Sequence, residues 1–545
     1  MKRIINTILV VVTLSSAAFT LSSCQDALDI RQAGELQEHE LYTSVENLKE
    51  VLNGAVYAQL DPIDEIYFTA VFTDEVKPGS GSGGQEYTLH RHFLDPASPI
   101  VTGGTVSTVS SDGIWLNNYR VINRINRLLE GAKKVTPTSV KEKEDYDKIL
   151  AQARAIRAYC YVQLEAYFSE DMRNPNALGV TLLKDVPATD AKLPRAKNQE
   201  VYDFINEDLD YARSILGYSL ASDKIARYAA DKGFVNAVTA RFNLYRGNMI
   251  LAKQYADEVI VNSKLLLTQA SPFTIKDDNP ANTTYGEDLE VGSKDWNPKF
   301  YDETSSFNPY RNLWNDFDRG EIIFSLNRLP LGAGQSIGSR WNTNQSILKG
   351  SPMWFWGRNL YNLLEETPGD IRRYAYVDPT SDAKADYASA TAGATRNDAL
   401  VIDKYPGKTS TPTRNDIKVF RMSEMYFIKA EAEVAAGNLV AAHDLIHQVR
   451  TARNYLGKAV TPTYTNAQTA YADILKERRI ELALEGHRYL DLKRLAVAAN
   501  VSMDRNPTDD IVPVKNLANG DHRYTLPIPI KEVSANPNMQ QNDKY

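Results

Sequence analysis

The sequence predicts a mainly α-helical protein, in which stacked helix pairs are interrupted by one long, loop-rich insert with short strands. Three observations predict this class. Helical spacing of apolar residues recurs from Trp115 onward, one helix pair occurs twice in the chain, and between residues 266 and 414 the composition changes to that of turns and loops. With 545 residues, 43% of them hydrophobic, the chain can bury a large core.

The first residues have the pattern of a secretion signal. Lys2 and Arg3 precede an apolar run at residues 4–14, which is too short to span a bilayer as a permanent helix. The LSSC sequence at residues 21–24 resembles a bacterial lipobox, which would make Cys24 the lipidated first residue of the mature protein. The alternative is ordinary secretion with an incidental cysteine. We therefore expect a signal peptide at residues 1–23 and a polar, acidic tether at residues 24–40.

Residues 149–168, ILAQARAIRAYCYVQLEAYF, predict a helix that packs closely against a neighbour. Small residues recur on one helical face at spacings of three and four: Ala151, Ala155, Ala158, Val162 and Ala166. Cys160 lies in the same segment and is the one cysteine left once Cys24 is assigned to lipidation. It is expected to be a small core residue.

An internal duplication defines the scaffold. Residues 239–259 align with residues 429–449 at one constant offset, so that Ala240 matches Ala430 and Gly247 matches Gly437. The pattern resembles the tetratricopeptide repeat, with a small residue in the first helix and a Gly-Asn turn before the second. Two further helix pairs are expected, one over residues 115–168 and one beginning at Asn198.

The segment between the two copies, residues 266–414, is expected to form an irregular ligand-binding insert. Long loops in compact proteins tend to be functional, and strand-like runs such as EIIFSL occur here. Five of the six tryptophans also lie here: Trp296, Trp314, Trp341, Trp354 and Trp356.

Flat rings and amide groups in the insert suit the faces and hydroxyls of a sugar. The candidate ligand-binding residues are Trp341, Trp354, Trp356, Trp296, Tyr310, Trp314, Asn342, Arg358 and, in a preceding Gly-rich loop, Tyr87. Trp354 and Trp356 would face the same side of an extended segment and could form a platform, while Tyr301 adds a ring to a second cluster around Trp296. The alternative is that these rings are buried where the insert meets the helices.

The densest run of charge, ERRIELALEGHRYLDLKR at residues 477–494, favours a structural role. Arg478, Glu481, Glu485 and Arg488 are three or four residues apart, so on one helix they would form a ladder of opposite charges. Catalysis is not expected, since no nucleophile elbow, phosphate loop or dinucleotide fingerprint occurs. His443 and His447 are spaced like zinc ligands, but without a third ligand they are expected to be surface residues, so neither a metal nor a cofactor is predicted. The net charge of -7 and the scattered Lys and Arg argue against nucleic acid as a partner.

Taken in order, several segments make the chain resemble the SusD/RagB family of Bacteroidetes outer-membrane lipoproteins. They are the lipobox at Cys24, FTDEVKPG, ARAIRAYCYVQLEAYF, VYDFINEDLDYA, KGFVNAVTARFNLYRGN, GEIIFSL, RMSEMYFIKAEAEVAAGN, ERRIELALEGHRYLDLKR and the tail LPIPIKEVSANPNMQQNDKY. The resemblance implies a tetratricopeptide-like scaffold at residues 41–265 and 415–545, with the insert at 266–414 between them. It also implies a cell-surface lipoprotein, anchored in the outer membrane, that partners a SusC-like TonB-dependent transporter.

The expected function is therefore to bind a nutrient, foremost an oligo- or polysaccharide, and to deliver it to that transporter. Two alternatives stay open: a peptide-binding member of the same family, and a repeat scaffold that binds only proteins.

Overall fold

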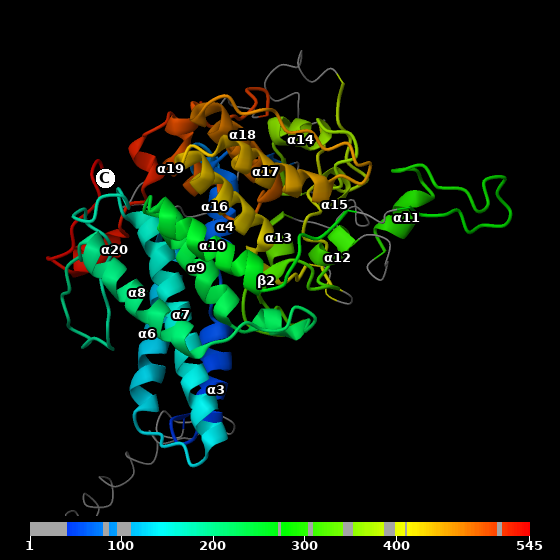
Figure 1. The fold of residues 1–545 in the computed structure, drawn as a ribbon. Helices are drawn as coiled ribbons and strands as arrows, with labels where there is room; N and C mark the ends of the chain where they lie inside the picture. The colour runs from blue at the N-terminus through cyan, green and yellow to red at the C-terminus, as the bar shows by residue number, and fades with distance from the viewer. Residues whose placement is uncertain are drawn as a thin grey trace, which may run out of the picture.

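The computed structural model describes residues 41–79, 87–94, 111–270, 274–302, 309–341, 352–385, 398–408, 411, 413–509 and 515–545. This part of the chain is mainly helical (Figure 1). It also contains two short antiparallel sheets of two strands each. The predicted fold class, a scaffold of helix pairs with a loop-rich insert containing short strands, is confirmed.

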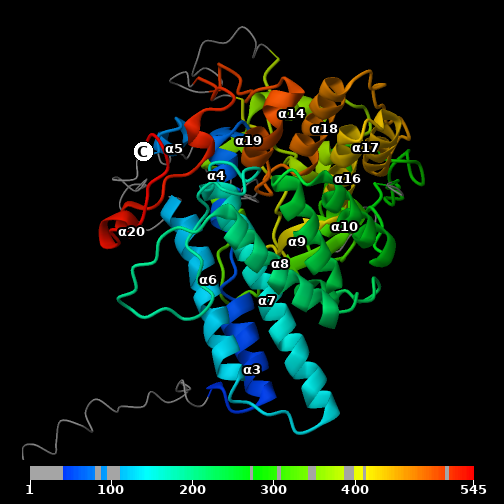
Figure 2. The ribbon, with the colours of Figure 1, turned by 60° about the vertical axis from the view of Figure 1, so that its left-hand side comes forward.

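The N-terminal part of the chain is a bundle of helices. Its elements are α3 (Val45–Val51), η1 (Leu52–Tyr57), α4 (Ile63–Phe72), β1 (Val76–Pro78), α5 (Tyr87–His90), α6 (Ser111–Ala132), α7 (Val140–Phe168), α8 (Asn198–Ile215), η2 (Ile225–Tyr228), α9 (Lys232–Tyr245) and α10 (Met249–Asn262). Helix α7 has 29 residues and begins after Ser139, whose side-chain oxygen accepts a hydrogen bond from the backbone N–H of Glu142. With α3 and α6 it forms an arm that points away from the rest of the molecule (Figures 1 and 2).

The insert contains short helices and two strands, and the C-terminal part returns to long helices. The elements of the insert are α11 (Trp296–Phe300), α12 (Pro309–Trp314), β2 (Ile322–Leu326), α13 (Ile337–Trp341), β3 (Trp354–Trp356), α14 (Arg358–Glu365) and α15 (Arg372–Tyr376). They are followed by β4 (Ile417–Arg421), α16 (Met422–Ala435), α17 (Leu439–Arg453), α18 (Ala467–Glu481), α19 (Arg488–Ala499), η5 (His522–Tyr524) and α20 (Ile530–Ala535). The predicted strand EIIFSL is β2.

The two copies of the duplicated helix pair have the same turn. Helix α9 packs on α10 and α16 packs on α17, and α10 also packs on α16. Between the helices of each pair, Gly247 and Gly437 have φ angles of 80° and 82°, the left-handed conformation that glycine adopts without strain. The N–H groups of Asn248 and Asn438 reach back to the carbonyls of Asn243 and Glu433, both at 2.8 Å. These bonds close the first helix of each pair with the same geometry.

Both sheets join segments that are far apart in sequence. Strand β1, from the N-terminal part, pairs with β3 of the insert, with Val76 opposite Trp356. Strand β2, from the insert, pairs with β4, which leads directly into α16. The insert is therefore tied to the helices before it and after it by backbone hydrogen bonds.

One large apolar core connects these parts. It contains Ala151, Ala155 and Ala158 on the small-residue face of α7, and Cys160 is fully buried, as predicted. Burial raises the pKa of the Cys160 thiol well above its ordinary value. None of the helices within the described ranges is both long and apolar enough to cross a membrane.

Candidate functional site

Three of the candidate tryptophans, including the two expected to form a platform, are enclosed by protein. Trp341, Trp354 and Trp356 are each 0% exposed. Trp354 Nε1 donates to the hydroxyl of Tyr67 at 2.8 Å, Trp356 Nε1 donates to the carbonyl of Tyr376 at 3.1 Å, and the Trp341 ring lies 5.5 Å from the Tyr67 ring. An enclosed ring cannot stack on a sugar. The exposed platform is therefore absent from this structure, and the alternative of burial against the helices holds for these rings.

The second aromatic cluster is buried as well. Trp296 stacks on Phe300 at 4.3 Å, the Tyr310 hydroxyl lies 2.6 Å from that of Tyr376, and the Lys404 ammonium lies 4.2 Å from the centre of the Trp314 ring. Trp296, Tyr310 and Trp314 are each fully buried, and Tyr301 is partly buried. The sequence left burial and exposure of these rings open, because aromatic side chains serve both cores and sugar sites.

Of the remaining candidate residues, the structure describes the side chain of Arg358 alone. Arg358 is partly exposed, but its Nη1 lies 2.7 Å from Asp398 Oδ1 and its Nε donates to Asn362 Oδ1. Its guanidinium is thus engaged by the protein itself. Asn342, Cys24 and the side chain of Tyr87 lie outside the described residues.

Four segments distant in sequence meet beside the β1–β3 sheet. Lys77 of β1 lies 3.0 Å from Asp398 Oδ2 and 3.6 Å from Asp509 Oδ1, and these three side chains are almost fully buried. The backbone N–H of Arg358, directly after β3, donates to Asp509 Oδ2 at 3.1 Å. We call Lys77, Arg358, Asp398 and Asp509 the strand junction. It fixes four chain segments at one end of the molecule.

A polar groove with a volume of about 590 Å³ lies close to the strand junction. This volume is within the range of small-ligand sites, about 300–1,000 Å³. The groove is lined by Leu363, Ala472, Leu475, Lys476, Arg479, Arg488, Asn500, Val501, Ser502, Met503, Asp504, Asn516 and Asn519. Its elements α14, α18 and α19 lie at the end of the molecule opposite the arm (Figures 1 and 2).

Hydrogen bonds connect the groove to the strand junction through α14. Asn359, the residue after Arg358, donates from Nδ2 to Asp504 Oδ1 at 2.8 Å. Its own Oδ1 accepts from Nδ2 of Asn506 at 2.9 Å. The segment that forms one wall of the groove is therefore held against the same helix that the strand junction fixes.

Asp74 supports the base of the groove. Arg488 donates from Nε and Nη2 to the two carboxylate oxygens of Asp74, both at 2.8 Å, and Arg479 Nη2 lies 3.4 Å from Asp74 Oδ2. The backbone N–H of Asp504 donates to the same Oδ2 at 2.8 Å. Burial alone would raise the pKa of Asp74, but the guanidiniums of Arg479 and Arg488 outweigh it and hold the pKa well below its ordinary value. Asp74 is therefore ionised and orients both arginines.

The charged run at residues 477–494 is structural, but its members do not form the predicted ladder. Helix α18 ends at Glu481, and Leu484 has a φ of 58°, so Glu485 lies in a turn and Arg488 begins the next helix. Each charged group pairs with a residue outside the proposed ladder. Arg478 bonds Asp491, Glu485 bonds Lys404 and Arg421, and Arg488 bonds Asp74. The ladder prediction assumed one continuous helix, and the spacing of the charged residues does not indicate that α18 ends at Glu481.

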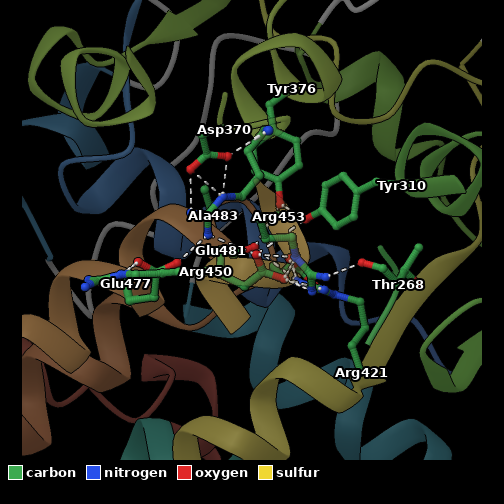
Figure 3. A network of polar contacts seen from close by, with 12 residues as sticks. Thr268, Tyr310, Asp370, Tyr376, Arg421, Arg450, Arg453, Glu477, Glu481 and Ala483 are labelled. Carbon is green, nitrogen blue, oxygen red and sulfur yellow. Dashed lines mark hydrogen bonds and ion pairs between the residues drawn. The ribbon is translucent and has the colours of Figure 1, made fainter. Parts of the chain in front are cut away.

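Glu481 is the centre of a buried ion network that joins the insert to the scaffold (Figure 3). Its carboxylate accepts from Arg453 Nη2 at 2.7 Å, Arg421 Nη1 at 2.8 Å and Arg372 Nη1 at 3.1 Å. Burial opposes ionisation of Glu481, yet the surrounding guanidiniums lower its pKa well below the ordinary value. Arg372 belongs to α15 of the insert, whereas Arg453 and Glu481 belong to scaffold helices. The network therefore links the insert to the scaffold. Its charged side chains are buried, so they are not accessible to a ligand.

The spaced histidines lie on one face of α17. The rings of His443 and His447 are 5.9 Å apart, and both contact Thr461. Within the described ranges, no group of three or more His, Cys, Asp or Glu side chains is placed to hold a metal ion.

Fold and groove together define a helical-repeat protein with a ligand-sized polar depression at one end of its scaffold. Residues 44–244 match a family described as starch-binding and associating with the outer membrane, and residues 336–545 match the SusD family. The chain belongs to the SusD/RagB family.

Individual relatives match along nearly the full chain. SusD-like proteins P38 and P2 of Formosa agariphila are 24% and 23% identical over 100% and 98% of this chain, and over 99% and 98% of their own lengths. A SusD superfamily protein of Bacteroides thetaiotaomicron superposes with a TM-score of 0.69 at 20% identity, covering 92% of this chain and 100% of its own. A protein described as a laminarin-binding SusD-like protein superposes with a TM-score of 0.62 at 22% identity over the same shares. At these identities the structural likeness establishes the fold.

Sequence reasoning missed the groove residues that follow α19. Asn500, Ser502, Asp504, Asn516 and Asn519 carry no periodic pattern, and they meet α18 only because the chain turns back after Asn500, which has a left-handed φ of 51°. The density of Asn and Asp in residues 500–519 was the available signal.

Proposed function

We propose that this chain is a cell-surface lipoprotein that binds a nutrient oligo- or polysaccharide and delivers it to a SusC-like TonB-dependent transporter in the outer membrane. Membership of the SusD/RagB family is the observation that carries the proposal. The matched description of starch binding and outer-membrane association supports it, as does the neighbour described as laminarin-binding. The groove beside α18 provides a site of suitable size within the chain itself.

Attachment to the membrane is proposed to occur through Cys24. The LSSC sequence supports signal cleavage before this residue and its acylation, and residues 24–40 would then be the tether to the folded part. Replacing Cys24 with Ser should move the protein from the membrane fraction to the soluble fraction of the cell envelope. Unchanged membrane retention would contradict the anchor.

We infer that the protein binds its ligand without converting it chemically. Incubating the purified protein with each oligosaccharide that it binds should leave that oligosaccharide intact by chromatography. Release of a shorter product that depends on the protein would overturn this inference.

Peptide binding by the same groove is the second candidate function, since amides and a partly apolar wall suit a peptide as well. A repeat scaffold that binds only proteins is the third. Calorimetry of the protein beginning at Gln25, against panels of neutral and anionic glycans and of peptides, separates the three. We expect saturable binding of a glycan. Binding to peptides alone favours the second function, and no binding to either panel favours the third.

A further inference from the structure

The groove beside α18 has two unlike walls. Leu363 of α14 and Ala472 of α18, which are both partly exposed, give one side an apolar surface, and Leu475 lies buried beneath it. The segment after α19 contributes amide, hydroxyl and carboxylate groups to the other side, from Asn500, Ser502, Asp504, Asn516 and Asn519. A pyranose ring has the same two characters, with C–H groups on its faces and hydroxyls around its edge.

The polar wall is held in place by bonds within the protein. Asn519 Nδ2 donates to the carbonyl of Val501 at 2.6 Å, and Asn516 Oδ1 accepts from the backbone N–H of Arg505 at 2.8 Å. Asp504 is held from two sides, because Oδ1 accepts from Asn359 and Oδ2 accepts from Arg479 Nη1 at 3.1 Å. Groups fixed in this way lose little conformational freedom when they bind a ligand.

The positive charges of the groove are matched by acids. Arg479 and Arg488 share Asp74, and Arg479 also bonds Asp504. Lys476 lies 2.7 Å from Glu366 in a pair at the surface. Each cation that lines the groove therefore has a carboxylate partner, and an anionic ligand would have to compete with that partner.

We propose that this groove binds a neutral oligosaccharide, with a pyranose face against Leu363 and Ala472 and with hydroxyls bonded to Ser502, Asp504 and Asn519. The inference rests on the proposed function and deepens it by naming the site and the ligand class. A sulfated or uronic-acid glycan gains nothing from cations that are already paired, and it meets the exposed carboxylate of Asp504.

Two variants test the site. Ser502→Trp fills the groove from an exposed position, and Asp504→Asn removes the charge while preserving the shape of the side chain. Ser214→Trp, at an exposed position of α8 outside the groove lining, is the matched control. Thermal melts by circular dichroism verify that each variant is folded. The probes are neutral laminarin oligosaccharides, other neutral oligosaccharides, and sulfated and uronic-acid oligosaccharides.

We expect Ser502→Trp to weaken binding of the neutral ligand at least tenfold and Asp504→Asn to weaken it severalfold, while Ser214→Trp leaves it unchanged. Anionic glycans should bind at least tenfold more weakly than the neutral ligand. If a glycan binds the unmodified protein and Ser502→Trp equally well, the groove is excluded and the proposed function stands. A preference for anionic glycans overturns the ligand class. Failure of the unmodified protein to bind any glycan overturns the proposed function and this inference together.

Discussion

Glu481 shows at the scale of a single residue how this protein tolerates buried charge. It is fully enclosed, and its carboxylate is satisfied by three guanidiniums that come from α15, α17 and the end of β4. Removing one charge from such a network leaves the opposite charges buried and unbalanced, which costs about 3–5 kcal/mol.

We therefore expect Glu481→Gln to lower the free energy of unfolding by about 3–5 kcal/mol. Urea denaturation followed by circular dichroism measures the change. The control is Asp145→Asn, which breaks a surface pair with Lys141 at 2.5 Å and should leave the free energy of unfolding almost unchanged. Equal effects for the two variants would show that the buried network does not fasten the insert.

Three buried glutamates, Glu65, Glu75 and Glu165, predict a loss of stability toward alkaline pH. Burial is the main cause that raises the pKa of each to about 8, from an ordinary value of 4.5. When folding raises the pKa of a carboxyl, its protonated form contributes to the free energy of unfolding, and this contribution is fully present below pH 4.5, the ordinary pKa. That contribution is lost as the pH rises through 8, because the unfolded chain releases the proton first.

Glu165→Gln isolates one of these groups. Between pH 5 and 8 the unmodified protein should lose stability relative to the variant by about 1.4 kcal/mol per pH unit, as urea titrations at several pH values can measure. Glu165 Oε1 accepts from the backbone N–H of Val180 at 2.9 Å. Because the substitution alters this bond, it also adds a constant, pH-independent difference in the free energy of unfolding. A difference that stays constant with pH would mean that Glu165 is ionised in the folded protein.

At the scale of elements, the sequence predicted features that depend on neighbouring residues, and it did not predict contacts between segments that are far apart in the chain. The repeated turns at Gly247 and Gly437 and the small-residue face of α7 follow from spacing within one or two helices, so they could be predicted. The pairing of β1 with β3 joins segments that are about half the chain apart, at residues 76–78 and 354–356. No spacing encodes that contact, and the burial of Trp354 and Trp356 depends on it. The groove was missed for the same reason, since its two walls come from different parts of the C-terminal half.

The turn glycines should be sensitive to substitution even where space is available. A Cβ at Gly437 would meet no atom within 4 Å, but the φ of 82° is strained for any side chain. Gly437→Ala should therefore destabilise the protein by about 1–2 kcal/mol. Gly54, in η1, also has open space around a Cβ and lacks a left-handed φ, so Gly54→Ala should be neutral or stabilising. Thermal unfolding compares them, and an equal melting temperature for both would contradict the strain argument.

Strand β3 allows a direct test of whether its rings are core or binding surface. Trp354→Ala removes a fully buried ring and its bond to Tyr67, and it should cost about 3–5 kcal/mol. Trp354→Phe keeps most of the volume and should cost less. The free energy of unfolding, by urea denaturation, and glycan binding, by calorimetry, are measured for both variants. Loss of binding in a Trp354→Phe variant of unchanged stability would restore a direct ligand role for this ring.

At the scale of the whole molecule, the insert is joined to the scaffold by strand pairing, by buried ion pairs and by a shared apolar core. Its strands complete both small sheets, Arg372 enters the Glu481 network, and its rings belong to the single large core. An element attached by so much buried contact cannot open while the rest stays folded.

We therefore expect insert and scaffold to unfold in one cooperative transition. The chain provides two separate probes, because five of its six tryptophans lie in the insert whereas the longest helices lie in the scaffold. Tryptophan fluorescence and far-ultraviolet circular dichroism, measured along the same urea titration, should give coincident curves. Glu481→Gln should shift both midpoints together, since it weakens a contact that the two parts share. A fluorescence transition at lower urea than the loss of helix would show that the insert is an independent unit, with the strand pairs and the ion network too weak to couple it to the helices.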